Sequence, residues 1–396
     1  MAQPTTETRP GLAMIANCLT PYRAHLHELI VAGVPELKLH TLITHDDADF
    51  KWAAPIPDAI NVTHLGRKGE SPLAGTFHSP LGEWQKGGRL IEYLRDHHVG
   101  AVICFGYRYI SYLRLIRYCH AAGVPLFVNT DSNIRSEARL PPVKSWLKRQ
   151  SYSWWLKRSA GVMPMGRLGE DFFRKYGADS RRFYRLPYTP DYEAFATVRP
   201  DQLQRFRQQH RLCGGRRILL FSGRLAPVKR VDLLIAAFAS VAGERPEWDL
   251  LIAGDGPLRD ELQRAAARLG SRVVWTGFLE QDELKLAYHS ADVLVLPSDR
   301  EPWAVVVQEA MAAGLAVVAS DVVGAADELV ADGRAGRIFA AGDVEALRQA
   351  LLDVTGAERI DEYKQRARDA LWAWREKLDP VAEVRRALAD AGVLAK

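Results

Sequence analysis

The chain has 396 residues, of which 47% are hydrophobic and 26% are charged, a composition typical of a soluble globular protein. This length exceeds what one hydrophobic core normally covers and favours two domains of about 200 residues each. The net charge of +5 is a mild bias toward anionic partners and does not indicate a nucleic-acid-binding protein.

Neither a membrane span nor a secretory signal is indicated. No segment approaches the roughly 18 uninterrupted apolar residues that a membrane span needs. The N-terminal stretch MAQPTTETRP is polar, so we expect a cytoplasmic location. The four cysteines have neither zinc-ligand spacing nor disulfide density, and we expect reduced thiols at Cys18, Cys104, Cys119 and Cys213.

In the first half of the chain, short apolar runs alternate with helical patterns, as in a parallel sheet. The first helix is predicted to begin near Tyr22, with Thr20 as N-cap and Pro21 as the first helical residue. Strands are predicted at GLAMIAN, LKLHTLI, GAVICF and PLFVNT, and helices around residues 83–97, 109–122 and 143–159.

A linker is predicted at LPYTPDYEAF, where two prolines disfavour regular structure. We therefore place one domain over residues 1–187 and a second over 188–396, and leave open whether the last helices, about 372–396, pack back on the first domain. After a helix over 200–211 the alternation restarts, with strands predicted at RRILLFSGR, WDLLIAGDG, RVVWTGF, DVLVLPS, AVVAS and AGRIFA. The fold class is thus α/β, with two doubly wound, Rossmann-like domains whose strand ends face a cleft.

The stretch EPWAVVVQE places a carboxylate at each end of an apolar run, at Glu301 and Glu309. Pro302 and Gly314 predict a helix from about Trp303 to Ala313 between two strands. The two carboxylates then lie about 10 Å apart along the helix, too far to share one proton or one metal. They suit the two ends of an elongated ligand, with helix N-terminal amides facing an anion between them. The alternative is a loop acid at Glu301 and a solvated helix residue at Glu309.

Two cations follow the strand ILLFSG, at the point where Gly223 permits a tight turn. Arg224 and Lys229 lie between this strand and the next helix, a position that suits a phosphate or diphosphate. Both residues can instead be ordinary surface cations. Gly254 and Gly256 in IAGDGP permit close backbone approach, which alone is a weak signal.

Taken together, these segments resemble the family 4 glycosyltransferases of GT-B fold. The resemblance spans about residues 216–352, and Glu301 and Glu309 match the family's E-x7-E motif. The first half matches more loosely, through NCLTPYRAHL and SAGVMPMGRLGEDFFRKYGAD. The matching segments, in family order, are GRLAPVKRVDLLIAAF, LLIAGDGPLRDEL, TGFLEQDELKLAYHSADVLVLPS, EPWAVVVQEAMAAGLAVVAS and GRAGRIFAAGDVEALRQAL.

The resemblance implies a retaining transferase that moves a hexose-type sugar from a nucleotide-diphosphate donor without a metal or other cofactor. It implies an acceptor hydroxyl on a glycan, a lipid-linked molecule or a small molecule, in cell-surface polysaccharide or glycolipid assembly. It also implies where each part of the donor binds. The diphosphate contacts Arg224 and Lys229 after Gly223, and the amides of Val305 and Val306. The donor sugar contacts Glu301, the ribose contacts Glu309, and the base lies near Phe278 and Leu279.

The acceptor side is predicted in the first domain, where Tyr22 and Arg23 follow the first strand and can face the cleft. Asp131 also follows a strand and is our candidate for assisting deprotonation of the acceptor hydroxyl, with helix or turn capping as the alternative. The chain departs from the family pattern twice. CLTPYR replaces a glycine-rich turn, and Ala304 replaces a glycine beside the donor sugar.

Asp47 and Asp49 in HDDAD have the D-x-D spacing of metal-dependent sugar transferases, with His45 nearby. Their place after a first-domain strand, far from the donor motifs, favours a solvated loop over a metal site.

The segment 143–158 is basic and aromatic and contains no acidic residue. On a helix, Val143, Leu147 and Trp154 form an apolar stripe, while Lys144, Lys148, Tyr152 and Trp155 share another side. This pattern suits an anionic membrane surface and a peripheral location at its inner face. A packing helix with exposed lysines is the alternative.

Two rival functions share the predicted architecture. A GT-B-like epimerase or hydrolase would act on the nucleotide sugar without an acceptor. A non-enzymatic nucleotide-sugar-binding module would bind the donor and transfer nothing, although the combination of Arg224, Lys229 and both glutamates argues against it.

Overall fold

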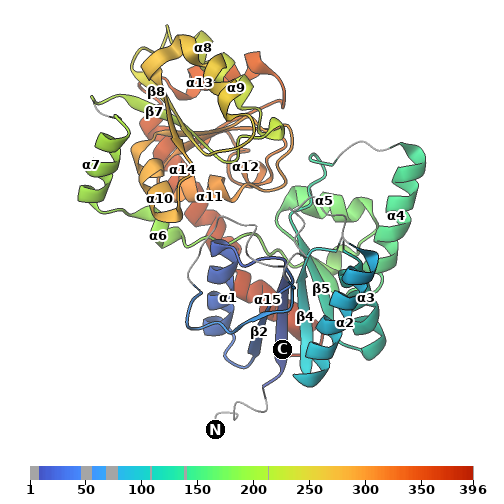
Figure 1. Ribbon diagram of the computed structural model, residues 1–396. Helices are drawn as coiled ribbons and strands as arrows, with labels where there is room; N and C mark the ends of the chain where they lie inside the picture. The colour runs from blue at the N-terminus through green and yellow to red at the C-terminus, as the bar shows by residue number, and fades with distance from the viewer. Residues whose placement is uncertain are drawn as a thin grey trace. The chain divides into compact units, whose positions relative to one another are not determined.

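The computed structural model describes residues 9–45, 56–67, 79–107, 109–137, 141–212 and 214–395. The chain divides into two compact units, each with its own parallel sheet (Figure 1). Unit 1 comprises Met1–Asp131, Ala138–Pro190 and Leu378–Lys396, and unit 2 comprises Ser132–Glu137 and Asp191–Lys377.

Unit 1 is built on a six-stranded parallel sheet of order β3-β2-β1-β4-β5-β6. Its strands are β1 (Gly11–Ala16), β2 (Lys38–Ile43), β3 (Val62–His64), β4 (Val99–Phe105), β5 (Leu126–Thr130) and β6 (Gly161–Pro164). Its helices are α1 (Pro21–Gly33), α2 (Pro80–Asp96), α3 (Ile110–Ala122), α4 (Pro142–Leu156), α5 (Arg167–Lys175) and α15 (Pro380–Asp390).

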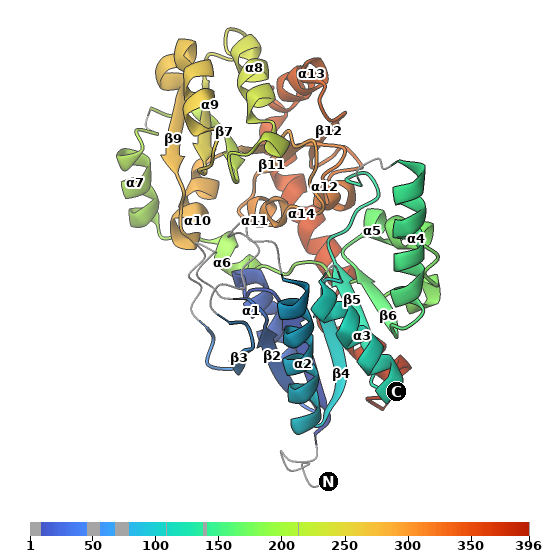
Figure 2. The same ribbon diagram turned by 45° about the vertical axis from the view of Figure 1, so that its right-hand side comes forward.

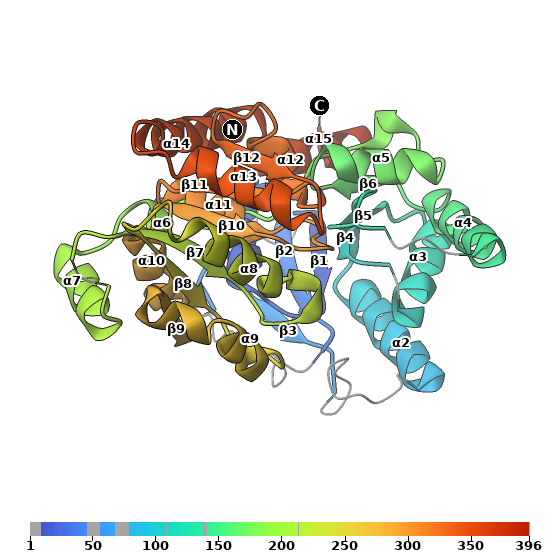
Figure 3. The ribbon, with the colours of Figure 1, turned by 90° about the horizontal axis from the view of Figure 1, so that it is seen from above.

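Helices cover both faces of this sheet, which explains why its central strands are apolar at nearly every position. Figure 2 shows α2 and α3 in front of the sheet, and Figure 3 shows α5 and α15 on the other side. The core on the α15 side joins strand residues such as Met14 and Ile103 to Ile30 of α1 and Leu388 of α15. Helix α15 belongs to this unit although it is the last helix in chain order and follows the helices of unit 2.

Unit 2 contains a second six-stranded parallel sheet, of order β12-β11-β10-β7-β8-β9. Its strands are β7 (Arg217–Ser222), β8 (Trp248–Ala253), β9 (Val273–Gly277), β10 (Val293–Leu296), β11 (Ala316–Ser320) and β12 (Gly336–Phe339). Its helices are α6 (Tyr192–Ala196), α7 (Pro200–Gln209), α8 (Val231–Val241), α9 (Arg259–Ala265), α10 (Gln281–Ser290), α11 (Val305–Ala312), α12 (Gly324–Leu329), α13 (Val344–Val354) and α14 (Ile360–Lys377).

The helices of unit 2 also form two layers. Helix α8 packs against α9 and α13, while α11 packs against α12 and α14. The central strands between them, such as β10 with its four buried residues, are apolar on both faces. The loops at the carboxyl ends of β7, β8, β9 and β10 therefore emerge at one edge of a rigid, buried sheet.

The predicted strands all form, and two further strands, β3 and β6, appear that the pattern did not indicate. Strand β3 has only three residues, none of them buried, and β6 begins with a glycine and ends with a proline, residue types that are typical of turns. The division between the units falls after Pro190 rather than after residue 187, and the chain returns to unit 1 at Leu378 rather than near residue 372. Residues 132–137 belong to unit 2, although they lie between two segments of unit 1 in the chain. The sequence did not predict this assignment.

Thr20 takes the N-cap position of α1 and Pro21 is its first residue, but the Thr20 side chain makes no capping hydrogen bond. The helix around 143–159 begins at Pro142 and ends at Leu156. Cys18, Cys104 and Cys119 are buried, and none of them forms a disulfide within the described residues. Burial raises the pKa of Cys119 to about 12. Cys213 lies outside the described residues.

Candidate donor site in unit 2

The loops after β7, β8 and β9 are in direct backbone contact. The amide of Gly254 donates to the carbonyl of Gly277 at 2.7 Å, and the amide of Gly223 donates to the carbonyl of Ala253 at 3.0 Å. Gly254 has a φ of 153°, and a Cβ at this position would lie 1.9 Å from the carbonyl oxygen of Gly223. The glycines therefore permit the backbones of neighbouring loops to contact each other. This contact holds the loop that carries Gly223, Arg224 and Lys229 in place.

Lys229 and Glu301 form an ion pair that joins the loop after β7 to the loop after β10. The side chains are 24% and 12% exposed, so the pair is largely shielded from water. A second pair, between Arg230 Nη1 and Asp299 Oδ2 at 2.9 Å, joins the same two loops nearby. The two strands are neighbours in the sheet, which is why residues 72 positions apart in the chain can meet.

Arg224 has a different setting from Lys229. Its side chain is exposed at the start of the same loop. Within the described ranges of the chain, no hydrogen bond or ion pair engages it. Arg224 is thus free to bind an anion, whereas Lys229 must share its charge with Glu301.

Helix α11 begins at Val305, two residues later than predicted, because Ala304 adopts a left-handed conformation with φ 74°. Pro302 and Trp303 remain in the loop. The Pro302 carbonyl accepts a hydrogen bond from Asn133 Nδ2 at 3.2 Å, and the Trp303 carbonyl accepts one from the Ala325 amide at 2.9 Å. The amides of Val305 and Val306 occupy the first turn of α11, where N–H groups lack intrahelical partners.

The backbone conformation of Ala304 is unfavourable, because a non-glycine residue in the left-handed region destabilises the fold by about 1–2 kcal/mol. The family that the sequence resembles often has glycine here, and glycine adopts this conformation without strain. The substitution noted in the sequence therefore falls on the residue whose backbone turns the chain into α11.

The segment 132–137 supports this loop from a distant part of the sequence. Ser136 Oγ accepts a hydrogen bond from the amide of Glu301 at 3.3 Å, and buried Asn133 donates to the carbonyl of Val322 at 3.0 Å. Sequence reasoning missed both residues because they follow β5 of unit 1 and carry no motif.

Glu309 is only 8% exposed, and its Oε2 accepts a hydrogen bond from the Tyr288 hydroxyl at 2.8 Å. Burial raises the pKa of this carboxyl to about 7. Within the part of the chain that the structure describes, Oε1 accepts no hydrogen bond, so one oxygen remains for a ligand. The prediction that Glu309 is a solvated helix residue, one of the two alternatives left by the sequence, is wrong.

The remaining predicted donor residues follow β9. Phe278 is half-buried and Leu279 is 7% exposed, directly after Gly277. Leu279 therefore packs in the interior of unit 2, and Phe278 is the more accessible of the two.

In unit 1, the predicted acceptor residues form an aromatic cluster at the carboxyl ends of β1 and β5. The ring of Tyr22 lies 4.4 Å from that of Tyr188, whose hydroxyl donates to Asp131 Oδ2 at 3.4 Å. Arg23 was expected to face a cleft but is buried, with Nη1 donating to Asn17 Oδ1 and to the Cys18 carbonyl, both at 3.0 Å. A buried guanidinium needs such partners, which makes Arg23 a support of the turn at residues 17–20.

Asp47 and Asp49 lie outside the described residues. Across the described ranges, no three His, Cys, Asp or Glu side chains are grouped as metal ligands. None of the helices in the same ranges has the length and apolarity required to cross a membrane.

Residues 203–369 match the family described as Glycosyl transferases group 1. This region is therefore a group 1 glycosyltransferase domain, and the two parallel α/β sheets of the chain match the GT-B glycosyltransferase fold. The chain is 32% identical over 267 residues to sulfoquinovosyl transferase SQD2 of Arabidopsis thaliana, covering 59% of this chain and 50% of the relative. It is 27% identical to alpha-D-kanosaminyltransferase of Streptomyces kanamyceticus, covering 79% and 84%.

Among solved structures, HepE of Anabaena in complex with UDP and glucose covers 98% of this chain and 100% of its own, with a TM-score of 0.70 and 16% identity. At this identity the likeness shows the fold alone. The chain spans about half the length of the Arabidopsis relative, 50%, so substrates and partners do not transfer from it directly.

The raised pKa of Glu309 predicts a pH-dependent stability. The folded carboxyl keeps its proton up to about pH 7, whereas the unfolded chain releases it near 4.5. The free energy of unfolding therefore falls as the pH rises through this window, by about 3 kcal/mol from this group. Relative to Glu309→Gln, the wild type should lose this amount between pH 4.5 and 7, as measured by urea unfolding.

Exposed Glu358 supplies the control, because Glu358→Gln should leave the pH profile of the wild type unchanged. Parallel profiles for the wild type and Glu309→Gln would show that folding does not raise the pKa of the Glu309 carboxyl.

Proposed function

We propose that the chain is a retaining glycosyltransferase that moves a hexose-type sugar from a nucleotide-diphosphate donor to a hydroxyl of a glycan, lipid-linked or small-molecule acceptor. The observation that carries the proposal is the Lys229–Glu301 ion pair beside the N-terminus of α11. It brings a cation for the phosphate next to a carboxylate for the sugar hydroxyls. The bond that breaks in such a donor joins a sugar to a phosphate.

The chemistry explains why these groups are needed. The bond between the anomeric carbon and the phosphate oxygen breaks, its electron pair stays on the diphosphate, and the sugar gains oxocarbenium character. Lys229, exposed Arg224 and the first amides of α11 oppose the negative charge that develops on the diphosphate. This set supplies charge stabilisation from the chain's own groups, and we propose that the reaction needs no metal or other cofactor.

Glu309 completes the donor contacts in this proposal. Its free Oε1 can accept hydrogen bonds from the ribose hydroxyls while Tyr288 holds Oε2. Phe278, half-buried after β9, is the candidate for contact with the base. The UDP in the HepE structure supports UDP sugars as the first donors to test.

For the acceptor, unit 1 offers Asp131 at the end of β5, with Tyr22 and Tyr188 adjacent. We propose that Asp131 assists deprotonation of the acceptor hydroxyl. The names of the relatives, a sulfoquinovosyl transferase and a kanosaminyltransferase, refer to the sugar that is transferred and specify no acceptor.

The experiment is a thermal-shift screen of UDP, GDP and ADP sugars, followed by transfer assays with the stabilising donor in EDTA. A product with retained anomeric configuration, assigned by NMR coupling constants, supports the proposal. Rapid epimerisation or hydrolysis of the donor without an acceptor would support the epimerase or hydrolase instead. Donor binding with no transfer to a panel of glycan, lipid-linked and small acceptors would support a binding module.

We further propose that the protein is cytoplasmic and binds the inner face of a membrane through α4, as suits glycolipid or cell-surface polysaccharide assembly. The apolar residues Val143, Trp146 and Leu147 are 71%, 59% and 55% exposed on this helix. Its other face is core: Tyr152 and Trp155 are buried, so the second stripe expected from the sequence does not face solvent. Exposed Lys144 and Arg149 flank the apolar residues and suit anionic lipids.

Vesicle co-sedimentation tests this surface. Binding to anionic vesicles should weaken when salt rises from about 50 mM to about 300 mM, because screening reduces attraction to the lipid surface. The double variant Trp146→Ala/Leu147→Ala should bind several-fold more weakly at both salt concentrations. Leu81 and Trp84 on α2 are similarly exposed, and Leu81→Ala/Trp84→Ala is the matched control. Equal losses in the two double variants would contradict a role specific to α4.

A further inference from the structure

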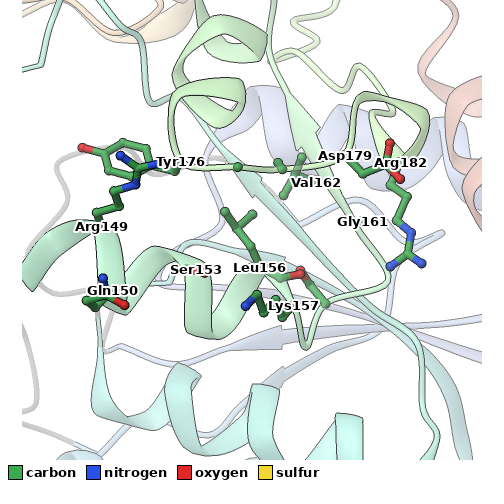
Figure 4. Close-up of a pocket in the computed structure, with 13 residues that line it drawn as sticks. Arg149, Gln150, Ser153, Leu156, Lys157, Gly161, Val162, Tyr176, Asp179 and Arg182 are labelled. Carbon is green, nitrogen blue, oxygen red and sulfur yellow. The ribbon is translucent and has the colours of Figure 1, made fainter. Parts of the chain in front are cut away.

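A cavity of about 460 Å³ lies in unit 1 between the second half of α4, the beginning of β6 and the turn after α5 (Figure 4). Its lining includes Gly161, the first residue of β6, so it lies at the amino end of this parallel sheet. The predicted acceptor residues lie at the opposite, carboxyl ends. The cavity is therefore separate from the candidate sites described above.

Three cations line this cavity: Arg149 and Lys157 from the α4 segment, and Arg182 after α5. Within the described ranges, none of these three side chains makes a hydrogen bond or a close ion pair. The one acidic lining residue, Asp179, already pairs with Arg181 at 2.8 Å. The cavity thus has three cationic side chains and a single acidic one, Asp179, whose charge is shared between Arg181 and Arg182. Guanidinium and ammonium groups around a concave site are the arrangement that proteins use for phosphate.

The cavity is continuous with the exposed apolar surface of α4. Trp146, Gln150, Ser153 and Lys157 are spaced by four, three and four residues, so they lie along one face of the helix. Trp146 is 59% exposed, and the other three line the cavity. An amphipathic ligand placed along this face would meet cations at one end and an indole ring at the other.

We propose that this cavity binds the phosphate headgroup of an anionic membrane phospholipid, while Trp146 and Leu147 enter the interface beside its acyl chains. The proposal rests on the membrane binding proposed above and adds a headgroup-specific site to it. A phosphomonoester suits the site best, because its higher charge and its three terminal oxygens can engage several cations at once. Tryptophan is suited to the boundary between headgroups and acyl chains.

The test is co-sedimentation with phosphatidylcholine vesicles that contain phosphatidic acid or phosphatidylserine at matched surface potential. Non-specific adsorption depends on the potential alone, so a headgroup site is reported by the preference between the two lipids. We expect the wild type to prefer phosphatidic acid about tenfold, the effect of one charge-assisted hydrogen bond, and Arg149→Gln/Lys157→Gln to lose that preference. Exposed Lys38 and Arg117 provide the matched control, and Lys38→Gln/Arg117→Gln should keep it.

The possible outcomes separate this inference from the proposals on which it rests. A wild type that binds both vesicles equally, or a cavity variant that keeps the preference, overturns the headgroup site alone. A wild type that binds no vesicle overturns the membrane surface as well. Tight binding of soluble glycerol 3-phosphate without vesicle binding would identify a metabolite site instead. The donor-induced thermal shift, measured on the same variants, should stay unchanged and reports separately on the donor site and on folding.

Discussion

Replacing Lys229 by alanine should lower the rate of sugar transfer about 10²–10³-fold while the protein still folds. The expected factor is that for removing one preorganised group from a developing negative charge. Lys229 is in direct contact with Glu301. In the proposed donor site this is the position of the sugar–phosphate bond, so we expect the loss of Lys229 to affect bond cleavage. The measurement is turnover at saturating donor, with circular dichroism to verify the fold.

Arg224→Ala should have a comparable effect on turnover but a different effect on stability. Arg224 is exposed and unpaired among the described residues, so its removal should leave the thermal midpoint unchanged. Lys229→Ala instead leaves the shielded carboxylate of Glu301 without its cation and should lower the midpoint. Controls are the exposed residues Arg268 and Lys377 of the same unit, whose replacement by alanine should leave turnover intact. Wild-type turnover in Arg224→Ala or Lys229→Ala would refute the diphosphate assignment.

Gly254→Ala should destabilise the protein by about 3 kcal/mol or more and abolish donor binding. Its Cβ would lie 1.9 Å from the Gly223 carbonyl oxygen, and its φ of 153° is one that side chains rarely adopt. Overpacking and backbone strain each cost about 1–3 kcal/mol. To relieve the overlap, the loop after β7 must move, and it carries Arg224 and Lys229 with it. Urea unfolding and the donor-induced thermal shift would measure the two effects.

Gly243 offers the matched control for this substitution. A Cβ there meets nothing within 4 Å, so Gly243→Ala should leave stability within about 1 kcal/mol of the wild type and donor binding unaffected. A Gly254→Ala protein that retains donor affinity would show that contact between the loops after β7 and β8 is not required for the site.

Much of the fold was predictable because its signals are local. Each long strand of unit 2 is an apolar run bounded by turn residues, and each meets neighbours of the same kind. Strand β3 was missed because it has three residues and none is buried, and β6 because its glycine and proline resemble a turn. The start of α11 was misplaced because Pro302 is a typical first helical residue, and nothing local shows that Ala304 is left-handed.

The candidate donor residues could also be named from the chain, since a glycine turn, two cations and two spaced carboxylates lie within three short segments. The ion pairing and the pKa values of these residues could not be predicted from the chain. Lys229 pairs with Glu301, whereas the Arg224 side chain has no partner among the described residues. This difference depends on which loops become neighbours when β7 and β10 pair. The burial that raises the pKa of Glu309 to about 7 is likewise produced by surrounding elements, including Tyr288 of α10.

Residue order alone was sufficient for the α/β class, the positions of the long strands and the identity of the phosphate-binding candidates, because periodicity, turns and motif spacing act over a few residues. Tertiary structure alone brought Ser136 to Glu301 and α15 to the core of unit 1, and it left three cations around one cavity beside α4. Such contacts join segments far apart in the chain, and their free energy is gained only when both surfaces are buried or paired together.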